Sequence, residues 1–504
     1  MLSCTFHTEN IDVPLSNKAP MNHLSGIGRE QITLFPEAIE DYITADNPVR
    51  FLDAFVDHLD MASLGFRHAT VNETGRPPYN PKDLLKLYLY GYLNRIRSSR
   101  LLERETKRNL EVVWLLKRLS PDHKTISDFR KDHAQALREV FKQFVVLCKQ
   151  LELFGAERVA IDSTKFKASN ARDRVKDKQQ LEGSITRISE SIGQYLAHME
   201  ENDHNDQTSA SPCVTKEALQ AKIARLQNQK AQLQEALQTL DQTQAKYASL
   251  TDPDCRLMKN ERRIEPAYTL QAAVDAQHSL IVDYELTQDA ADNNHLAPVA
   301  TAAKQILGVD TLTVCADAGY YDTVDLKACD DQTIITYVSV PEPKISKKTQ
   351  VPTPEYYHDK FIYDEASDVY RCPQGSMMRR FRSQSKEDGR RIYLYRTDAC
   401  HNCPVRASCT TSPRGRYISR WEHEAVLERL KERLAREPDI IKRRKAIIEH
   451  VFGTVKKIWG YGALLLRGLA KIASEAALMN LTYNIRRVLN IVGTRKLILH
   501  LQQP

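Results

Sequence analysis

The chain has 504 residues, of which 42% are hydrophobic and 27% charged, and its formal net charge is +7. This composition is typical of a globular protein and excludes a disordered or fibrous one, and the length predicts about three domains. No apolar run approaches the roughly 20 residues that a membrane-spanning helix needs. The first residues also lack the basic start and apolar stretch of a signal peptide, so we expect a cytoplasmic protein that does not enter a membrane.

The first part of the chain predicts an arm followed by an all-α domain. Residues 1–45 show little periodicity, whereas apolar residues recur at three- and four-residue steps through 46–153. Thr125, followed by Asp128, predicts the start of one helix. Short helices, tight joints and basic side chains are typical of a helix-turn-helix DNA-binding domain. The same pattern also fits a helical scaffold with a solvated charged surface.

Basic residues in this domain are the candidates for DNA contacts. Arg97 to Arg108 include arginines at steps of three, four and four, which predicts one arginine-lined helical face. The helix expected near Thr125 is the candidate for reading bases. The alternative is that the arginines pair with Glu103, Glu105 and Glu111 on a solvated surface. The candidate DNA-binding residues are Arg95, Arg97, Arg100, Arg104, Arg108, Lys124 and Arg130.

Residues 154–341 and 416–495 predict an α/β domain with a mixed sheet. A β-type run over 158–162 ends at Asp162, and another over 311–315 leads to Asp317. Between them we expect a β-hairpin near 267–287 and a helix over 292–306. A further strand is expected over 333–340 and a single amphipathic helix, which bears Glu449, over 439–458.

Two segments look like insertions into this domain. In 174–250, two runs of apolar residues spaced three and four apart flank a polar, turn-rich stretch, which predicts an antiparallel coiled-coil hairpin. In 342–415, Cys372, Cys400, Cys403 and Cys409 have the spacing Cys-x27-Cys-x2-Cys-x5-Cys. Four thiolates that include a Cys-x2-Cys pair suit one tetrahedral structural Zn²⁺ in a zinc-ribbon-like fold. His401 could replace one cysteine, and four unrelated thiols are the alternative.

Asp162, Asp317 and Glu449 are the candidate catalytic residues. Adjacent strands of one sheet would bring the two aspartates together, and a helix on that sheet would add the glutamate. Such a set cannot stay ionised without cations, and Mg²⁺, or Mn²⁺ in its place, prefers these oxygen ligands. Two ions would serve an in-line phosphoryl displacement. For Asp317 the alternative is a simple Asx-turn. Cations around Glu449 would hold DNA phosphates: Arg443, Arg444, Lys445, Lys456 and Lys457.

The chain resembles the DDE transposases of bacterial insertion sequences. The motifs that carry the resemblance are YNPKDLLKLYLYGYL, PDHKTISDFRKDH, AIDSTKFKA, ADAGYYD and RRKAIIEHVFGTVK. It implies an RNase H-like catalytic domain in which Asp162, Asp317 and Glu449 align with the metal-binding triad. The branch with a Tyr-Arg-Glu-Lys signature is the most similar, although Lys442 and Lys445 stand at the Tyr and Arg positions while Lys456 matches the Lys.

The resemblance implies metal-dependent cleavage of DNA at the ends of a mobile element and strand transfer into target DNA. The expected partners are double-stranded DNA, as terminal inverted repeats and as target, and further copies of the chain in a homodimer or larger assembly. The expected location is the bacterial nucleoid. Two alternatives remain, a catalytically silent DNA-binding protein adopted by the host and a metal-dependent nuclease without joining activity.

Overall fold

The computed structural model describes residues 38–70, 77–205, 216–243, 246–341, 351–387 and 389–502. The chain divides into two compact units, Met1–Thr44 and Ala45–Pro504. The described part of the first unit holds a short 3-10 helix, η1 (Ile39–Tyr42), and residues 1–37 of the expected arm lie outside the described residues. Within the described ranges, no helix combines the length and apolar character needed to cross a bilayer.

The second unit begins with a group of helices whose starts are capped by side chains. Asn47 and Asn80 each accept a backbone hydrogen bond at the start of a helix, and a proline follows each of them. The cap of the fifth helix is Asp122, which accepts from the backbone N–H groups of Lys124 and Thr125. The expected helix start at Thr125 was therefore wrong, because the N-cap lies three residues earlier, at Asp122. The helices are α1 (Pro48–His58), α2 (Pro81–Leu93), α3 (Ser99–Arg108), α4 (Leu110–Leu115), α5 (His123–Asp132) and α6 (Ala134–Gln150).

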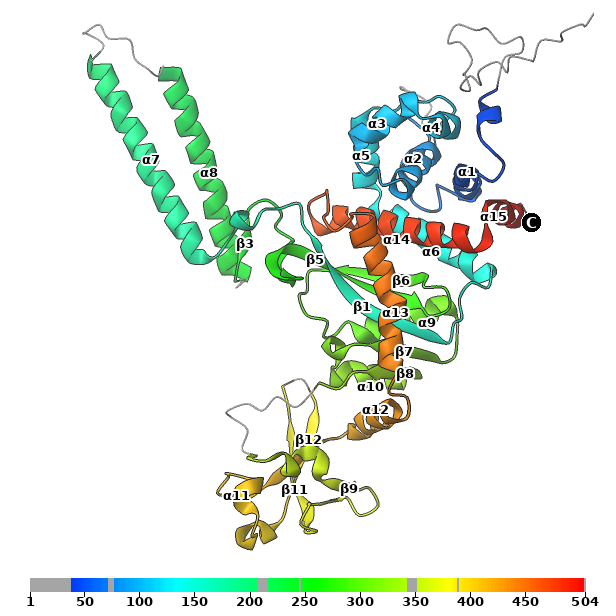
Figure 1. Ribbon diagram of the computed structural model, residues 1–504. Helices are drawn as coiled ribbons and strands as arrows, with labels where there is room; N and C mark the ends of the chain where they lie inside the picture. Colours follow the sequence, from blue (N-terminus) through cyan, green and yellow to red (C-terminus); the bar gives the residue numbers. More distant parts are fainter. Residues whose placement is uncertain are drawn as a thin grey trace, which may run out of the picture. The chain divides into compact units, whose positions relative to one another are not determined.

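A six-stranded mixed sheet follows, with the order β4-β5-β1-β7-β8 and with β6 also paired to β5 (Figure 1). β1 is antiparallel to β5 and parallel to β7, and β7 is parallel to β8. β1 continues well beyond Asp162, because β5 pairs with it as far as Lys167, so the expected strand end at Asp162 was wrong. The strands are β1 (Arg158–Lys167), β4 (Arg256–Asn260), β5 (Arg263–Asp275), β6 (Ile281–Thr287), β7 (Leu312–Ala316) and β8 (Ile334–Val338).

Helices cover this sheet. One apolar core packs α9 (Leu296–Leu307), α10 (Thr323–Asp331) and α12 (Glu424–Arg436) against the strands. α13 (Ile440–Phe452) contacts β1, β5, β7 and β8 (Figure 1). It does not form one continuous α-helix over 439–458 as expected, because a π-helical turn, η7, takes over at Gly453–Ile458.

The segment between β1 and β4 forms the expected helical hairpin. α7 (Lys178–Asn205) and α8 (Lys216–Thr243) lie side by side, shown in green in Figure 1. Leu181, Leu233 and Leu240 form the buried centre of their contact, with Ile185, Ile188 and Leu237 packed against it. These residues belong to the apolar stripes that predicted the hairpin. A two-stranded ribbon, β2 (Val175–Lys176) with β3 (Ala248–Ser249), closes its base.

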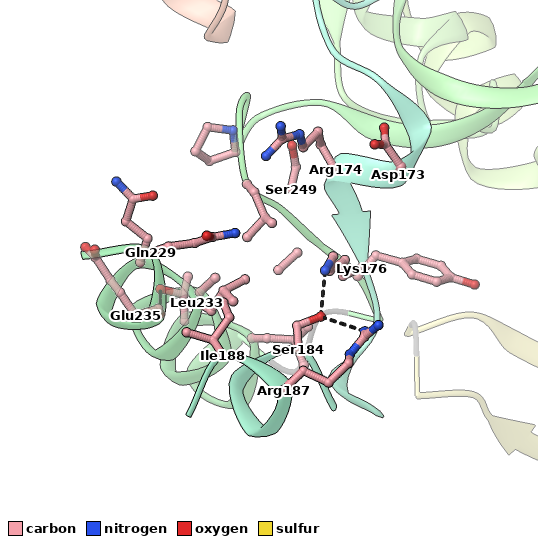
Figure 2. Close-up of a pocket in the computed structure, with 18 of the residues that line it drawn as sticks. Asp173, Arg174, Lys176, Ser184, Arg187, Ile188, Gln229, Leu233, Glu235 and Ser249 are labelled. Carbon is pink, nitrogen blue, oxygen red and sulfur yellow. Dashed lines mark hydrogen bonds between the residues drawn. The ribbon is translucent and has the colours of Figure 1, made fainter. Parts of the chain in front are cut away.

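The base of the hairpin also holds a pocket of about 940 Å³. Figure 2 shows basic side chains, including Arg174, Lys176 and Arg187, along its edge. Lys176 Nζ donates to Ser184 Oγ at 2.7 Å. None of the candidate catalytic residues lines this pocket.

A second sheet of five strands, in the order β13-β12-β11-β10-β9, occupies the cysteine-rich segment. Its own small core contains Phe361, Tyr370, Met378, Tyr395 and Ile418. The strands are β9 (Ile362–Asp364), β10 (Val369–Arg371), β11 (Met377–Ser385), β12 (Arg391–Arg396) and β13 (Tyr417–Trp421), with the short helix α11 (Arg406–Cys409) between the last two.

The C-terminal helices pack back onto the first helices of this unit. α14 (Leu469–Val492) contacts α6, α2 and α5, and α15 (Thr494–Leu501) contacts α1. Tyr461 donates its hydroxyl hydrogen to the carbonyl of Tyr92 at 2.6 Å. Arg486 donates to the carbonyl of Leu93 at 2.7 Å. The two ends of the unit therefore share one core.

Candidate active site

Asp162 and Asp317 stand on adjacent parallel strands. The register of β1 and β7 pairs Ala160 with Cys315, and each aspartate lies two residues further along its own strand direction. Because side chains alternate between the faces of a sheet, both carboxylates belong to the same face as Cys315. Cys315 packs on Ile440, at the start of α13. The two carboxylates therefore face the side of the sheet that α13 covers.

Asp317 is half-buried and ends β7 in a tight turn. Its Oδ1 accepts a hydrogen bond from the backbone N–H of Gly319 at 2.8 Å, which caps the 3-10 helix η3 (Ala318–Tyr320). The Asx-turn alternative is therefore present in the structure. It uses one carboxylate oxygen, so it does not exclude a second role for Asp317.

Asp162 has a cation partner that is remote in sequence. Arg444 Nη1, on α13, lies 2.7 Å from Asp162 Oδ2, and Ser163 N donates to Oδ1 at 2.8 Å. Burial raises the pKa of Asp162, and the charge of Asp317 raises it further, while Arg444 acts in the opposite direction. The site therefore holds more negative charge than Arg444 alone balances.

Arg444 was expected to contact DNA phosphates, but the structure buries it. Its relative exposure is 5%, and its guanidinium is paired with Asp162. Lys456 is also engaged internally, since its Nζ donates to the carbonyl of Lys165 at 2.8 Å. Arg443, Lys445 and Lys457 are exposed. Of the five cations expected around Glu449, three are therefore positioned at the surface.

Glu449 lies on α13, about one and a half turns beyond Arg444. It is exposed, and its carboxylate makes no hydrogen bond or ion pair with the described residues. The helix itself contacts β1 and β7. The structure thus places Glu449 on the helix that covers both aspartates, and no hydrogen bond or ion pair within the described residues ties its carboxylate to them.

Asp292 is a fourth acidic residue at this site, and the sequence did not reveal it. It was assigned to the first turn of a helix over 292–306, whereas α9 begins at Leu296 and leaves Asp292 in the preceding loop. A Cβ atom built on Gly319 would lie 3.0 Å from Asp317 Oδ1 and 3.1 Å from Asp292 Oδ2. The signal that could have revealed it is its place in a loop after a strand, which it shares with Asp317.

Basic residues of the helical region divide into buried and exposed groups. Arg130 is 4% exposed and donates to Tyr92 Oη and to the carbonyl of Arg97, each at 3.2 Å, so it cannot read bases as expected. Arg97 precedes α3 and donates to the carbonyl of Ala463 at 2.9 Å, so it does not belong to an arginine-lined helical face. The exposed members are Arg95, Arg100, Arg104, Arg108 and Lys124.

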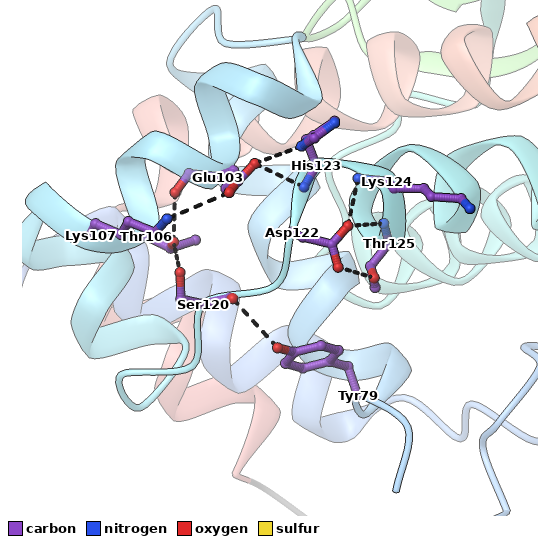
Figure 3. A network of polar contacts seen from close by, with 9 residues as sticks. All are labelled: Tyr79, Glu103, Thr106, Lys107, Ser120, Asp122, His123, Lys124 and Thr125. Atoms are coloured by element: carbon purple, nitrogen blue, oxygen red, sulfur yellow. Dashed lines mark hydrogen bonds and ion pairs between the residues drawn. The ribbon is translucent and has the colours of Figure 1, made fainter. Parts of the chain in front are cut away.

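The expected pairing of these arginines with glutamates is only partly observed. Arg108 Nε donates to Glu105 at 2.9 Å. Glu103 instead accepts from the backbone and the ring of His123, at 3.0 Å and 2.9 Å, at the start of α5 (Figure 3). Lys124 projects from the same helix start, where Asp122 forms the cap. Arg100 and Arg104 are therefore exposed arginines of α3 for which the described residues show no such pair.

The four cysteines Cys372, Cys400, Cys403 and Cys409 lie near one another. Burial raises the pKa of the Cys409 thiol, Arg416 opposes this, and the other three cysteines raise it further. Gly415 has a φ of +80°, and a Cβ atom there would lie 2.8 Å from the Cβ of Cys400. Across the described ranges, no group of three or more His, Cys, Asp or Glu side chains is arranged to hold a metal ion.

Comparison with known proteins gives two family matches. The first, described as a transposase domain (DUF772), covers residues 37–132. The second, described as a transposase DDE domain, covers residues 371–489 and includes Glu449. Asp162 and Asp317 lie between the two matched regions. Among curated proteins, none matches the chain.

The similar solved structures include a cryo-EM structure of a piggyBac transposase synaptic complex with hairpin DNA. The sequence identity is 10%, over 90% of this chain and 79% of that chain, with a TM-score of 0.31. A score this low carries no argument about the present chain. The family matches do, since both are to transposase domains and one is a DDE domain: together they support a DDE transposase of the insertion-sequence type.

Proposed function

We propose that the chain cleaves DNA at the ends of a mobile element and joins the freed 3′-OH to target DNA. The observation that carries this proposal is the placement of Asp162 and Asp317 on adjacent parallel strands, beneath the helix that bears Glu449. This arrangement supports the RNase H-like catalytic domain that the resemblance implies. Bacterial DNA, as terminal inverted repeats and as target, is the proposed partner, with a homodimer or larger assembly formed on it.

Asp162 and Asp317 offer the carboxylate oxygens that a hard divalent cation prefers. Two carboxylates approach each other on one face of the sheet, and burial together with mutual repulsion makes ionisation of Asp162 unfavourable without added positive charge. Asp162 and Asp317 would hold Mg²⁺ or Mn²⁺, and Glu449 would complete the ligands from α13. Two such ions supply charge stabilisation for in-line displacement at phosphorus. Arg444 keeps the Asp162 carboxylate in one orientation through its hydrogen bond.

Replacing each carboxylate by the corresponding amide, one at a time, tests this proposal. Asp162→Asn, Asp317→Asn and Glu449→Gln are each expected to abolish strand cleavage of supercoiled DNA that carries the element ends. DNA affinity should stay near that of the wild type, because the exposed cations are unchanged. Asp322→Asn is the matched control, since Asp322 caps α10 outside the carboxylate cluster. Near-normal cleavage by the Asp317→Asn protein contradicts the proposal. If the wild type cleaves DNA normally but does not join it to target DNA, the nuclease alternative is favoured.

We also propose that the exposed arginines of α3 contact DNA phosphates. Arg100→Ala and Arg104→Ala, made in the full chain, should weaken DNA binding and reduce the slope of log affinity against log salt concentration by about one per residue. Arg118→Ala is the control, because Arg118 is exposed in the loop after α4. An unchanged slope in the α3 variants would assign the phosphate contacts to another surface.

The four thiols are proposed to hold one structural Zn²⁺. The support is that Cys372, Cys400 and Cys403 all act on the pKa of Cys409, which places the four sulfur atoms in one neighbourhood. Elemental analysis of the protein purified without added metal should give about one zinc per chain, and Cys403→Ser should lose it. A folded wild type without zinc contradicts this site.

A further inference from the structure

A buried glutamine connects two parts of the carboxylate site. Gln271 lies on β5, opposite Ser163 of β1, and is fully buried. Its Oε1 accepts a hydrogen bond from the hydroxyl of Tyr320. Its Nε2 donates to Asp292 Oδ1 at 3.1 Å. Because an ionised carboxylate only accepts hydrogen bonds, this network fixes which end of the amide faces each partner.

Tyr320 links the Gln271 hydrogen bond to Asp317. It is the last residue of η3, the turn that Asp317 caps, and its backbone N–H donates to the carbonyl of Asp317 at 3.2 Å. Its side chain is fully buried in the core beneath the sheet. A tyrosine hydroxyl is protonated near neutral pH, and that of Tyr320 donates to Gln271 Oε1. The hydrogen bond to Gln271 therefore fixes the turn that orients Asp317.

The second partner of the Gln271 side chain is Asp292, which accepts from Nε2. Besides Gln271, Lys165 Nζ lies 3.9 Å from Asp292 Oδ1. Asp292 Oδ2 faces the space at Gly319 that Asp317 Oδ1 also borders. Gln271 thus contacts one residue that fixes Asp317 and one carboxylate that lies beside it.

We propose that Gln271 is a positioning residue of the carboxylate site, which sets the geometry of Asp317 and Asp292 through its two hydrogen bonds. This inference rests on the proposed function, because it assumes that the carboxylates bind a divalent cation. Residues that orient metal ligands typically change metal affinity or activity by about 10- to 100-fold when they are removed. Gln271 would do so without touching the ion or the DNA.

The test measures Mn²⁺ affinity of the full chain without DNA, by titration followed with electron paramagnetic resonance, beside the melting temperature. Gln271→Ala should weaken Mn²⁺ binding by roughly 10-fold or more. Tyr320→Phe, which removes one hydroxyl and keeps the buried ring, should shift affinity in the same direction, and it carries the test if Gln271→Ala fails to fold.

A matched control is Asn484→Ala. Asn484 is also a fully buried amide with two hydrogen bonds, to the backbone N–H and carbonyl of Ile281 at 2.9 and 2.8 Å. Its loss should lower the melting temperature and leave Mn²⁺ affinity unchanged. Equal losses of affinity in both alanine variants, or wild-type affinity in folded Gln271→Ala or Tyr320→Phe, would overturn the inference.

The Asp162→Asn protein separates this inference from the proposed function. If that variant loses Mn²⁺ binding while Gln271→Ala and Tyr320→Phe keep it, only the positioning role is wrong. If Asp162→Asn binds Mn²⁺ like the wild type, the proposed metal site is wrong, and the role of Gln271 is wrong with it.

Discussion

At the scale of single residues, the carboxylate site depends on partners that are distant in the chain. Asp162 and Arg444 are separated by 282 positions, yet their side chains form a hydrogen-bonded ion pair with 20% and 6% of the side-chain area exposed. A buried carboxylate without a partner is costly, and an arginine buried without one is too. The pair therefore contributes both to the fold and to the orientation of a candidate metal ligand.

We predict that Arg444→Met destabilises the protein by about 3 kcal/mol, because it leaves Asp162 partly buried without its cation. The free energy of unfolding, measured with chemical denaturant, tests this. Arg443→Met is the control, since Arg443 is an exposed neighbour on the same helix, and its effect should stay within about 0.5 kcal/mol. Equal losses in the two variants would mean that the ion pair contributes little.

Gly319 is a second residue that the carboxylate site depends on, because a side chain there would crowd Asp317 and Asp292. We predict that Gly319→Ala lowers cleavage about 10-fold, since the new methyl group would lie 3.0 Å from Asp317 Oδ1 and 3.1 Å from Asp292 Oδ2 and would push the carboxylates apart. The melting temperature should change little, because Gly319 is exposed. Gly193→Ala, where no atom lies within 4 Å of the new group, should cleave normally, and unchanged cleavage by Gly319→Ala contradicts the prediction.

At the scale of elements, the joint between α5 and α6 depends on one neutral histidine. His133 ends α5 and begins α6. Its Nε2 accepts from the backbone N–H of Arg67 at 3.0 Å, and Nδ1 lies 2.8 Å from the carbonyl of Phe129. The acceptor role of Nε2 places the single ring hydrogen on Nδ1, so protonation of Nε2 would break the contact with Arg67. Burial lowers the pKa of His133.

This lowered pKa predicts a loss of stability in acid. Between the folded pKa and the unfolded value of about 6.5, the unfolded chain binds more protons than the folded one. The contribution of neutral His133 to the free energy of unfolding is thus complete above about pH 6.5. It is lost as the pH falls towards the pKa of His133 in the folded protein. We expect the melting temperature to fall from pH 7.5 to 5.5, and to fall less in His133→Gln. His58→Gln, at an exposed histidine that does not act on the pKa of His133, should keep the wild-type dependence. An unchanged slope in His133→Gln contradicts the assignment.

At the scale of the whole molecule, the first and last helices of the second unit depend on each other. α6 and α2 contact α14, and α1 contacts α15. Arg97 adds a polar link, with its guanidinium 4.4 Å from the centre of the Tyr461 ring and its Nη1 3.8 Å from Glu475. The two regions that match transposase families, 37–132 and 371–489, therefore share contacts in the folded chain.

We predict that a fragment of residues 45–153 does not fold on its own, because it would expose the face of α6 that packs on α14 and the fully buried ring of Phe141, which packs on Tyr284 of β6. Circular dichroism and thermal melting should show reduced helicity and no cooperative transition, whereas residues 45–504 should melt cooperatively. A cooperative transition in the short fragment would show that the helical region is independent. DNA binding is for this reason best measured in the full chain.

Local patterns in the sequence were sufficient to predict several of the strands and helices. Short β-type runs predicted β1, β7 and β8, and the apolar stripes predicted the hairpin of α7 and α8, because residue preference and periodicity are local properties. The family itself was recognisable from short motifs, and the family matches confirm it. The roles of Asp162, Asp317 and Glu449 stay predictions, as does the zinc site.

Only the tertiary structure decided which partners these residues have. Arg444 and Arg130 look like surface cations in the sequence, and both are buried, because burial depends on which distant segment packs over a side chain. The loop position of Asp292 marks it as a candidate by itself, but no local pattern indicates that it meets Gln271. They meet because the sheet places β5 beside β1 and the loop before α9 beside the end of β7. A sequence encodes such contacts through the packing of the whole chain, which no short pattern records.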